Sequence, residues 1–432
     1  MSHHDLVIIG SGPAGHAAAF EAVKHGMKTA IVERDPTRLG GVCLGEGCIP
    51  LKGLLYHSHF SRDYTEIRDL VMKRVGSLRE GLRKRLSGLG VEIIPGEGRF
   101  VSEKELMVGE RALGASSYLI ATGSHPRRLF NQPNVLTSEG IFNMEGVPAR
   151  ALIIGGGVVG CEYASFLAAM GSAVDIVEAL ESPLYGEDEE AVRAMVREFK
   201  KRKIGVYGGC LVREILPGND VIMSAGAGER REKYDLIFET TGRSPSTAGI
   251  GLDAAGVRLS EKGYITVNDA MRTTNSAVYA AGDCIDTPML AYTAAREAET
   301  AVRHMAGAGV PPIDYGAMPR LVFSIPQVGS VGITEKEARE KNLDFRVYKY
   351  FFKALGKAVV EGRDAGFIKL IEDAETGKLL GAAVVGDEAA DIMNQLALIV
   401  KTGIRCCEVL DSMFVHPSYS EIIAEALLHG RH

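Results

Sequence analysis

Two cysteines separated by four residues are the feature of this sequence best suited to chemistry. Cys43 and Cys48 lie in the stretch "GGVCLGEGCIPLK", with glycines before and between them. Such a pair can bind a metal ion, form a structural disulfide, or open and close during turnover. The two glycines between the cysteines let a short loop close, and Pro50 is typical of the first turn of a helix. A helix starting near Cys48 would favour its thiolate form.

Zinc is the main alternative to redox chemistry, because His57 and His59 follow Cys48 and would complete four ligands. Cysteine pairs in zinc sites usually have two to four intervening residues, so this spacing lies at the edge of the range. We favour the redox pair and expect no metal site. The other cysteines are few and mostly scattered, as is usual in a reducing cytosol. They are Cys161, Cys210, Cys284 and the neighbouring Cys406 and Cys407, the last two interpreted as small core residues.

Two glycine motifs far apart in the chain have the same layout. In each, an apolar strand runs into Gly-x-Gly-x-x-Gly, a helical stretch follows, and a second strand ends in an acid 23 residues after the first glycine. The glycines would let the backbone approach a pyrophosphate at a helix N-terminus, and the acid would bind ribose hydroxyls. The sequence therefore predicts two dinucleotide sites. Their positions are Gly10, Gly12, Gly15 and Glu33, and Gly155, Gly157, Gly160 and Glu178.

The repeat continues beyond these motifs. "SYLIATGSHP" (117–126) parallels "DLIFETTGRSP" (235–245), each an apolar strand that runs into Thr-Gly and then Pro. In "AVYAAGDCID" a short strand delivers Asp283, which is placed to bind a sugar or ribitol hydroxyl. After Glu178 the sequence "ALESP" has no Arg or Lys and a further acid at Glu181, which favours NAD over NADP.

The composition excludes several classes of function. The 432 residues carry a net charge of −6, which argues against general nucleic-acid binding and against adhesion to anionic membranes. No apolar run reaches transmembrane length, and the start "MSHHDLVIIGSG" resembles no signal peptide. We therefore expect a cytoplasmic enzyme. Residues 64–88 read as an amphipathic helix with a solvated charged face, and 307–319 as a Gly/Pro-rich linker.

With both glycine motifs, the cysteine pair and a terminal "HPSYSE", the chain resembles the class I pyridine nucleotide–disulfide oxidoreductases over essentially its whole length. This family includes dihydrolipoamide dehydrogenase, glutathione reductase and mercuric reductase. The resemblance implies an α/β fold with two Rossmann-like domains, the NAD domain inserted in the FAD domain, and an α+β C-terminal domain that forms a homodimer. The expected boundaries are 1–145 and 251–313 for the FAD domain, 146–250 for the NAD domain, and 314–432 for the dimer-interface domain.

The resemblance also assigns the catalytic roles. Cys48 is expected to face the flavin, and Cys43 to attack the substrate disulfide. Lys52 would lie at the flavin N5 edge, paired with Glu162. The acid–base group would come from the partner subunit: His416 held by Glu421.

FAD and NAD are the implied cofactors, and their contacts carry over by motif. For FAD the expected residues are Gly10, Gly12, Pro13, Ala14, Gly15, Glu33, Gly41, Val42, Lys52, Gly98, Ala121, Thr122, Gly123, Asp283, Met289, Leu290 and Ala291. For NAD they are Gly155, Gly157, Val158, Val159, Gly160, Glu178, Val212 and Gly242.

Some of these residues also have ordinary structural interpretations. Lys52 and Glu162 would serve equally as surface charges. Ser418-x-x-Glu421 fits a capping box at a helix start, which would make Glu421 structural.

Within the family, the segments "CLGEGCIP" and "DAGFIKLIEDAETGKLLGAAVVG" are most similar to dihydrolipoamide dehydrogenase. Gly45 stands where the family usually has Asn, Leu51 where it has Ser, Thr or Lys, and Tyr292 where dihydrolipoamide dehydrogenases usually have His. These departures leave the substrate open: a lipoyl group, free or carried by a multienzyme complex, glutathione disulfide, coenzyme A disulfide, or Hg(II). Mercuric reductase is disfavoured because no cysteine follows "HPSYSE". A flavin NADH oxidase or a non-catalytic assembly subunit is the alternative from another class.

Overall fold

The computed structural model describes residues 3–226 and 228–430, and the chain forms two compact units. The first unit runs to residue 54 and also contains 65–127 and 243–313. The second contains 55–64, 128–242 and the described residues from 314 onward. Each unit is therefore assembled from segments that are far apart in the sequence.

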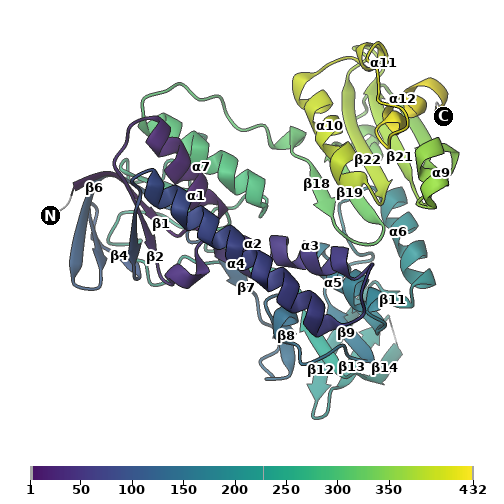
Figure 1. The fold of residues 1–432 in the computed structure, drawn as a ribbon, viewed down its shortest axis with the longest axis horizontal. Helices are drawn as coiled ribbons and strands as arrows, with labels where there is room; N and C mark the ends of the chain where they lie inside the picture. Colours follow the sequence, from purple (N-terminus) through teal and green to yellow (C-terminus); the bar gives the residue numbers. More distant parts are fainter. Residues whose placement is uncertain (1–2, 227, 431–432) are drawn as a thin grey trace. The chain divides into compact units, whose positions relative to one another are not determined.

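A mostly parallel sheet forms the centre of the first unit (Figure 1). Its strands are β1 (His3–Ile9), β2 (Thr29–Glu33), β3 (Glu92–Pro95), β4 (Gly98–Ser102), β5 (Glu105–Val108), β6 (Arg111–Ile120) and β17 (Val278–Ala280). β3, β2, β1, β6 and β17 run parallel in that order, and β5 and β4 continue antiparallel from β6. Most of β1 is apolar and buried, as expected where helices cover both faces of a parallel sheet.

The helices of this unit carry the two predicted functional loops. They are α1 (Pro13–Lys24), α2 (Gly41–Gly45), α3 (Cys48–His57), α4 (Tyr64–Gly88) and α7 (Ala291–Met305). α1 and α7 lie side by side (Figure 1). α4 confirms the long helix expected over 64–88, and its charged side chains are mostly exposed.

The second unit repeats the parallel arrangement. Its strands β8 (Val135–Thr137), β9 (Arg150–Ile154), β10 (Ala173–Val177), β11 (Ile204–Tyr207) and β15 (Leu236–Glu239) pair in the order β11-β10-β9-β15-β8. The order β11-β10-β9-β15 matches β3-β2-β1-β6 in the first unit, so the sequence repeat is also a structural repeat. The fifth strand differs in its connection, because β8 precedes β9 in the chain whereas β17 follows β6. The helices are α5 (Val158–Ala169) and α6 (Glu189–Lys201), and an antiparallel sheet holds β12 (Cys210–Leu216), β13 (Asp220–Ala225) and β14 (Gly228–Lys233).

The two Thr-Gly-x-x-Pro segments, which the sequence shows only as similar, pair with each other in the first unit. β7 (Ser124–Pro126) and β16 (Arg243–Pro245) form an antiparallel ribbon in which Ser244 lies opposite His125. The chain therefore leaves this unit and returns to it at one place.

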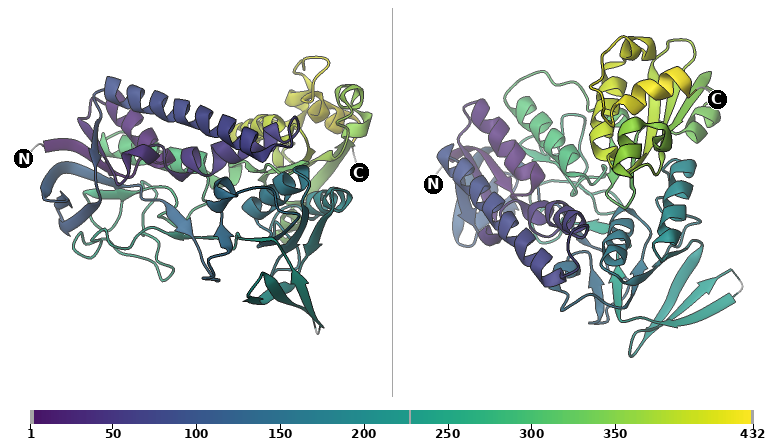
Figure 2. Two further views of the ribbon diagram at one scale, coloured as in Figure 1. Left: turned by 60° about the horizontal axis from the view of Figure 1, so that its bottom comes forward. Right: turned by 45° about the vertical axis from the view of Figure 1, so that its right-hand side comes forward.

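The C-terminal part of the second unit is a five-stranded antiparallel sheet with helices, which confirms the expected α+β class (Figure 2). The strand order is β18-β19-β22-β21-β20. The strands are β18 (Arg320–Val322), β19 (Gln327–Gly332), β20 (Phe345–Phe351), β21 (Phe367–Asp373) and β22 (Leu379–Gly386). The helices are α8 (Glu335–Glu340), α9 (Gly356–Glu361), α10 (Ala389–Thr402), α11 (Cys406–Leu410) and α12 (Glu421–His429).

One core prediction is half wrong. Cys406 is buried in the core of the C-terminal sheet, but Cys407 is exposed. Both residues start α11, and successive residues of a helix point in different directions, so only one of them can face the core. No helix among the described residues is long and apolar enough to span a membrane.

The glycine motifs owe their shape to backbone contacts that leave no room for a Cβ atom. Gly10 and Gly155 both adopt φ of 104°, a left-handed conformation that favours glycine. A Cβ on Gly15 would lie 2.0 Å from the Gly10 carbonyl oxygen, and one on Gly160 would lie 2.0 Å from that of Gly155. Each helix therefore packs directly on its own loop.

Replacing Gly160 with alanine should destabilise the second unit. The new methyl group would collide with backbone, and overpacking of this kind costs about 1–3 kcal/mol, more than the helix propensity gained from alanine. The matched control is Gly157→Ala, because a Cβ at Gly157 meets nothing within 4 Å. Thermal unfolding should show a lower midpoint for Gly160→Ala alone, and equal midpoints would contradict the packing argument.

Candidate active site

The loop that carries the two cysteines is shaped by glycines. Gly40 and Gly41, at the start of α2, have positive φ angles of 94° and 67°. A Cβ on Gly47 would lie 2.9 Å from the carbonyl oxygen of Val42, so the chain between the cysteines folds tightly back on itself. α3 begins at Cys48, as the proline three residues into the helix predicts.

The two cysteine side chains lie within hydrogen-bonding reach of each other, in the reduced form. The hydrogen bond with Cys48 raises the pKa of Cys43 well above its ordinary value, and burial and the negative charge of a Cys48 thiolate raise it further. Lys52 is close enough to lower this pKa, and Asp283 to raise it. Loss of both thiol protons together is therefore disfavoured, and the predicted site residues Cys43, Cys48, Lys52 and Asp283 lie together in the first unit.

The three residues that depart from the family pattern, Gly45, Leu51 and Tyr292, lie in different surroundings. Leu51 is buried on α3. Tyr292 is exposed at the start of α7. A Cβ built on Gly45 would lie 3.0 Å from a guanidinium nitrogen of Arg79, so this arginine occupies the space beside the redox loop. Sequence reasoning did not identify Arg79, whose place on α4 gives no local signal.

The first glycine motif fits the diphosphate of a dinucleotide. A Cβ on Gly12 would meet nothing within 4 Å, so the loop is open in front, and a Cβ on Gly41 would lie 2.8 Å from the Cα of Gly12. The Glu33 carboxylate accepts hydrogen bonds from the N–H groups of Ser11 and Asp35, both at 3.1 Å. This fixes the acid beside the loop, where a ribose would lie. Pro13, Ala14 and Gly15 open α1, and Val42 lies in α2.

A buried hydroxyl beside this motif also fits a ligand. Thr122 Oγ1 is buried and has no hydrogen-bond partner among the described residues. It follows β6 with Ala121 and Gly123, and a Cβ on Gly10 would lie 2.3 Å from the Ala121 carbonyl oxygen. Buried polar atoms rarely lack a partner, so an absent group that accepts this hydrogen bond would fit the site.

Asp283 is fixed by residues that sequence reasoning missed. Its carboxylate accepts a hydrogen bond of 2.6 Å from Ser124 and lies 3.9 Å from Arg243 Nε, which itself donates to Ser124 at 2.6 Å. Ser124 and Arg243 come from β7 and β16, so the ribbon formed by the two repeated segments orients the acid. The repeat of Thr-Gly-x-x-Pro was the only signal for this. Of the other predicted FAD contacts, Met289, Leu290 and Ala291 lie at the N-terminal end of α7 and Gly98 begins β4.

The second glycine motif reproduces the first in its hydrogen bonds. Glu178 accepts from the N–H groups of Gly156 at 2.7 Å and Leu180 at 2.8 Å, the positions equivalent to Ser11 and Asp35. Gly157, like Gly12, faces open space. The remaining predicted contacts lie at the start of α5 (Val158, Val159 and Gly160), in β12 (Val212) and after β15 (Gly242).

Glu162 is buried, at 1% exposure, so its interpretation as a surface charge is wrong. It accepts a hydrogen bond of 2.9 Å from the Phe323 N–H. A buried carboxylate needs a cationic or hydrogen-bonding environment. Lys52 is half-buried on α3, and its pairing with Glu162 stays a prediction.

His416 and Glu421 form the expected pair. His416 Nδ1 lies 2.7 Å from Glu421 Oε1, and the imidazole is 80% exposed, which leaves Nε2 available. The Ser418 N–H holds the pKa of Glu421 below its ordinary value, and the bond to His416 adds to this. Only half of the predicted capping box forms: Glu421 accepts the Ser418 N–H at 2.7 Å, but the Ser418 hydroxyl has no partner among the described residues, and α12 is capped by Ser420.

No group of three or more His, Cys, Asp and Glu side chains among residues 3–226 and 228–430 is placed to hold a metal ion.

Two family models together match nearly the whole chain. The model described as pyridine nucleotide-disulphide oxidoreductase matches residues 4–298, and the dimerisation domain of the same family matches residues 318–427. The chain belongs to the pyridine nucleotide-disulphide oxidoreductase family. It is an FAD-dependent enzyme that moves electrons between NAD(H) and a dithiol/disulfide couple.

Relatives of this oxidoreductase match along nearly their full length. The dihydrolipoyl dehydrogenase of Chlamydia muridarum is 33% identical, with 98% of this chain and 96% of the relative covered. That of Thermus scotoductus is 34% identical, with 99% and 97% covered. Among solved structures, the HOCl-induced flavoprotein disulfide reductase RclA from Escherichia coli, as its Cu(II) complex, has a TM-score of 0.93 at 26% identity, with 99% of both chains covered. LpdA from Mycobacterium tuberculosis shares the fold, with a TM-score of 0.91 at 24% identity and 99% of both chains covered.

The enzyme should prefer NADH to NADPH. A 2′-phosphate would approach the Glu178 carboxylate, and repulsion there should cost about 1–3 kcal/mol, or roughly ten- to a hundredfold in affinity. Glu178→Ala should narrow the gap in kcat/KM between the two nucleotides. The exposed neighbour Glu181, changed to Gln, is the control and should alter the ratio less. Equal or better use of NADPH by the native enzyme would overturn this assignment.

Proposed function

We propose that this oxidoreductase is of the dihydrolipoamide dehydrogenase type and that Cys43 and Cys48 are its redox disulfide. The main observation in support is that the two thiols contact each other close to the charges of Lys52 and Asp283. The names of the curated relatives support a lipoyl-type substrate, free or carried by a multienzyme complex. The dimerisation domain supports a homodimer, and the scattered thiols support a cytoplasmic location.

In the proposed mechanism, FAD supplies the two-electron exchange between the nicotinamide and the cysteine pair. Gly10, Gly12 and Gly15 would hold its diphosphate, with Glu33 on the ribose and Asp283 on the ribitol. Lys52, paired with the buried Glu162, would lie at the reactive edge of the isoalloxazine ring. The Gly155–Gly160 motif and Glu178 would bind NAD.

The thiol steps use this chain's own residues. His416 Nε2 takes the proton from Cys43, whose raised pKa otherwise keeps it protonated. The Cys43 thiolate attacks one sulfur of the substrate disulfide, and the other sulfur leaves as a thiolate that His416 protonates. The Cys48 thiolate then attacks the Cys43 sulfur, which closes the Cys43–Cys48 disulfide and releases the second substrate sulfur as a thiolate that takes its proton from solvent. Glu421 holds Nδ1 of His416 and so fixes which ring nitrogen works.

A second candidate is the reduction of another small disulfide. Arg79 lies beside Gly45 in the redox loop, and positive charge there suits an anionic disulfide such as glutathione disulfide or coenzyme A disulfide. The fold similarity to the disulfide reductase RclA supports the same alternative. NADH oxidation measured with lipoamide, glutathione disulfide, coenzyme A disulfide and Hg²⁺ distinguishes the candidates. Oxidation that proceeds only with O₂ would instead indicate an NADH oxidase.

Cys43→Ser and Cys48→Ser should each abolish disulfide reduction, because closing the redox disulfide needs both sulfurs. Reduction of the bound flavin by NADH should survive, since that step needs neither thiol. Cys407→Ser is the control, because Cys407 is exposed and lies outside the pair; its turnover should stay within about twofold. Turnover of lipoamide or another disulfide by either redox-loop variant would refute the assignment.

Activity should require two subunits, since His416 is expected to serve the cysteine pair of the partner. Subunits carrying Cys43→Ser and subunits carrying His416→Ala should each be inactive alone. Mixed dimers should regain activity, because one of their two sites then has both an intact cysteine pair and an intact histidine. The proposal would be contradicted if mixed dimers formed by subunit exchange regained no activity. Full activity from a demonstrated monomer would contradict it as well.

A further inference from the structure

The segment between Glu178 and α6 is attached to the second glycine motif at two places. Glu178 accepts the Gly156 N–H, and further along, the Leu184 N–H donates to the Gly156 carbonyl oxygen at 2.9 Å. A Cβ on Gly156 would lie 3.0 Å from Pro183. Residues 178–184 therefore form one wall of the motif, and a displacement of this segment displaces Gly156 with it.

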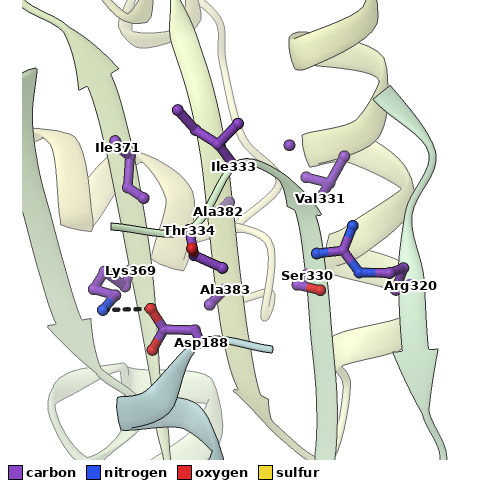
Figure 3. A pocket seen from close by; sticks show the side chains of 11 residues that line it. Asp188, Arg320, Ser330, Val331, Ile333, Thr334, Lys369, Ile371, Ala382 and Ala383 are labelled. Atoms are coloured by element: carbon purple, nitrogen blue, oxygen red, sulfur yellow. Dashed lines mark ion pairs between the residues drawn. The ribbon is translucent and has the colours of Figure 1, made fainter. Parts of the chain in front are cut away.

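The far end of the same segment is held by charges on the C-terminal sheet. Glu187 accepts hydrogen bonds from Arg320 on β18, at 2.8 Å, and from Ser330 on β19. Asp188 pairs with Lys369 on β21 at 2.6 Å, and the two side chains point toward one another in Figure 3. Three of the five strands thus contribute to holding two consecutive acids.

Lys369 is the least exposed member of this group. Its side chain is 4% exposed, and its ammonium also lies 3.1 Å from Glu335 and 3.4 Å from Glu190. Burial alone lowers the pKa of Lys369, but the carboxylates of Asp188 and Glu335 outweigh it and raise the pKa above its ordinary value. Lys369 is therefore a charged amine enclosed by acids.

The small cavity beside these residues excludes a ligand-binding role for the cluster. It measures about 10 Å³ and is lined by Asp188, Lys369, Arg320, Ser330 and apolar side chains of the sheet. That is room for at most one water molecule. Asp188 also caps α6, accepting the N–H groups of Glu190 at 3.0 Å and Ala191 at 3.1 Å. The pairing with Lys369 thus fixes the point where the segment enters the helix.

We propose that Lys369 is a positioning residue for nicotinamide dinucleotide binding, because it anchors Asp188 and thereby the 178–188 segment that carries Glu178 and packs on Gly156. The inference rests on the proposed role of Glu178 and the second glycine motif in binding NAD. Lys369 touches neither substrate nor cofactor and acts only through the segment.

The test is the affinity of the FAD-loaded enzyme for NAD⁺, measured by isothermal titration calorimetry without any disulfide substrate. Lys369→Met should raise the Kd for NAD⁺ at least about tenfold, while kcat at saturating NADH stays within about twofold of native. Lys349→Met is the matched control, because Lys349 on the neighbouring strand β20 pairs with Glu190 inside α6 and not with Asp188. Its Kd should stay within about twofold.

If Lys369→Met does not fold, the same Kd for NAD⁺ is measured on the double variant Lys369→Met/Asp188→Asn. Asparagine still caps the helix, and no carboxylate is left unpaired at position 188. The double variant should also bind NAD⁺ more weakly, about fivefold or more. A native Kd in a folded single or double variant overturns the inference, as does an equal loss of kcat, which would indicate general loosening. A native enzyme that binds NAD⁺ but reduces no disulfide would refute the proposed function. The role of Lys369 in NAD⁺ binding could still be tested in that case.

Discussion

The structure depends on a contact made twice, in which the first turn of a helix lies directly on the loop that leads into it. At Gly15 and Gly160 a single added carbon would lie 2.0 Å from a backbone oxygen. This close approach brings the helix N-terminus to the end of the central strand, and with it the N–H groups proposed to bind a diphosphate. The acids Glu33 and Glu178 then fasten each loop from the neighbouring strand through backbone N–H groups. The shape of both proposed cofactor sites therefore follows from backbone packing.

The loop that carries Cys43 and Cys48 depends on a different constraint, which is the free-energy cost of placing two thiolate charges side by side. Contact with Cys48 raises the pKa of Cys43 and so makes it hard for Cys43 to lose its proton, while the charge of Lys52 nearby acts in the opposite direction. In the proposed mechanism, the exposed His416–Glu421 pair provides a base that can receive the proton Cys43 must give up. In this proposed mechanism the glycine loop, the lysine one helical turn later and the histidine serve the same proton and electron transfers.

The sequence predicted the parts of the site that depend on local pattern. Gly-x-Gly-x-x-Gly followed at a fixed distance by an acid identified both dinucleotide motifs, and the long helix over 64–88 followed from its periodicity. Contacts between distant segments were not predictable. The orientation of Asp283 by Ser124 and Arg243 requires two strands 119 residues apart to pair. The exposure of Cys407, the burial of Glu162 and the place of Arg79 beside Gly45 likewise depend on how helices pack, which no local pattern encodes.

The ribbon of β7 and β16 has a consequence for how such a chain can arise. Pro126 and Arg243 are direct partners in this ribbon, so the ends of the 116 residues between them lie side by side within the first unit. A whole dinucleotide-binding module can enter a folded protein at such a place without stretching the host sheet, since the host chain is interrupted where its two ends already touch. The matching order of four strands in the two parallel sheets is what duplication of an ancestral gene, followed by insertion of one copy into the other, would leave behind.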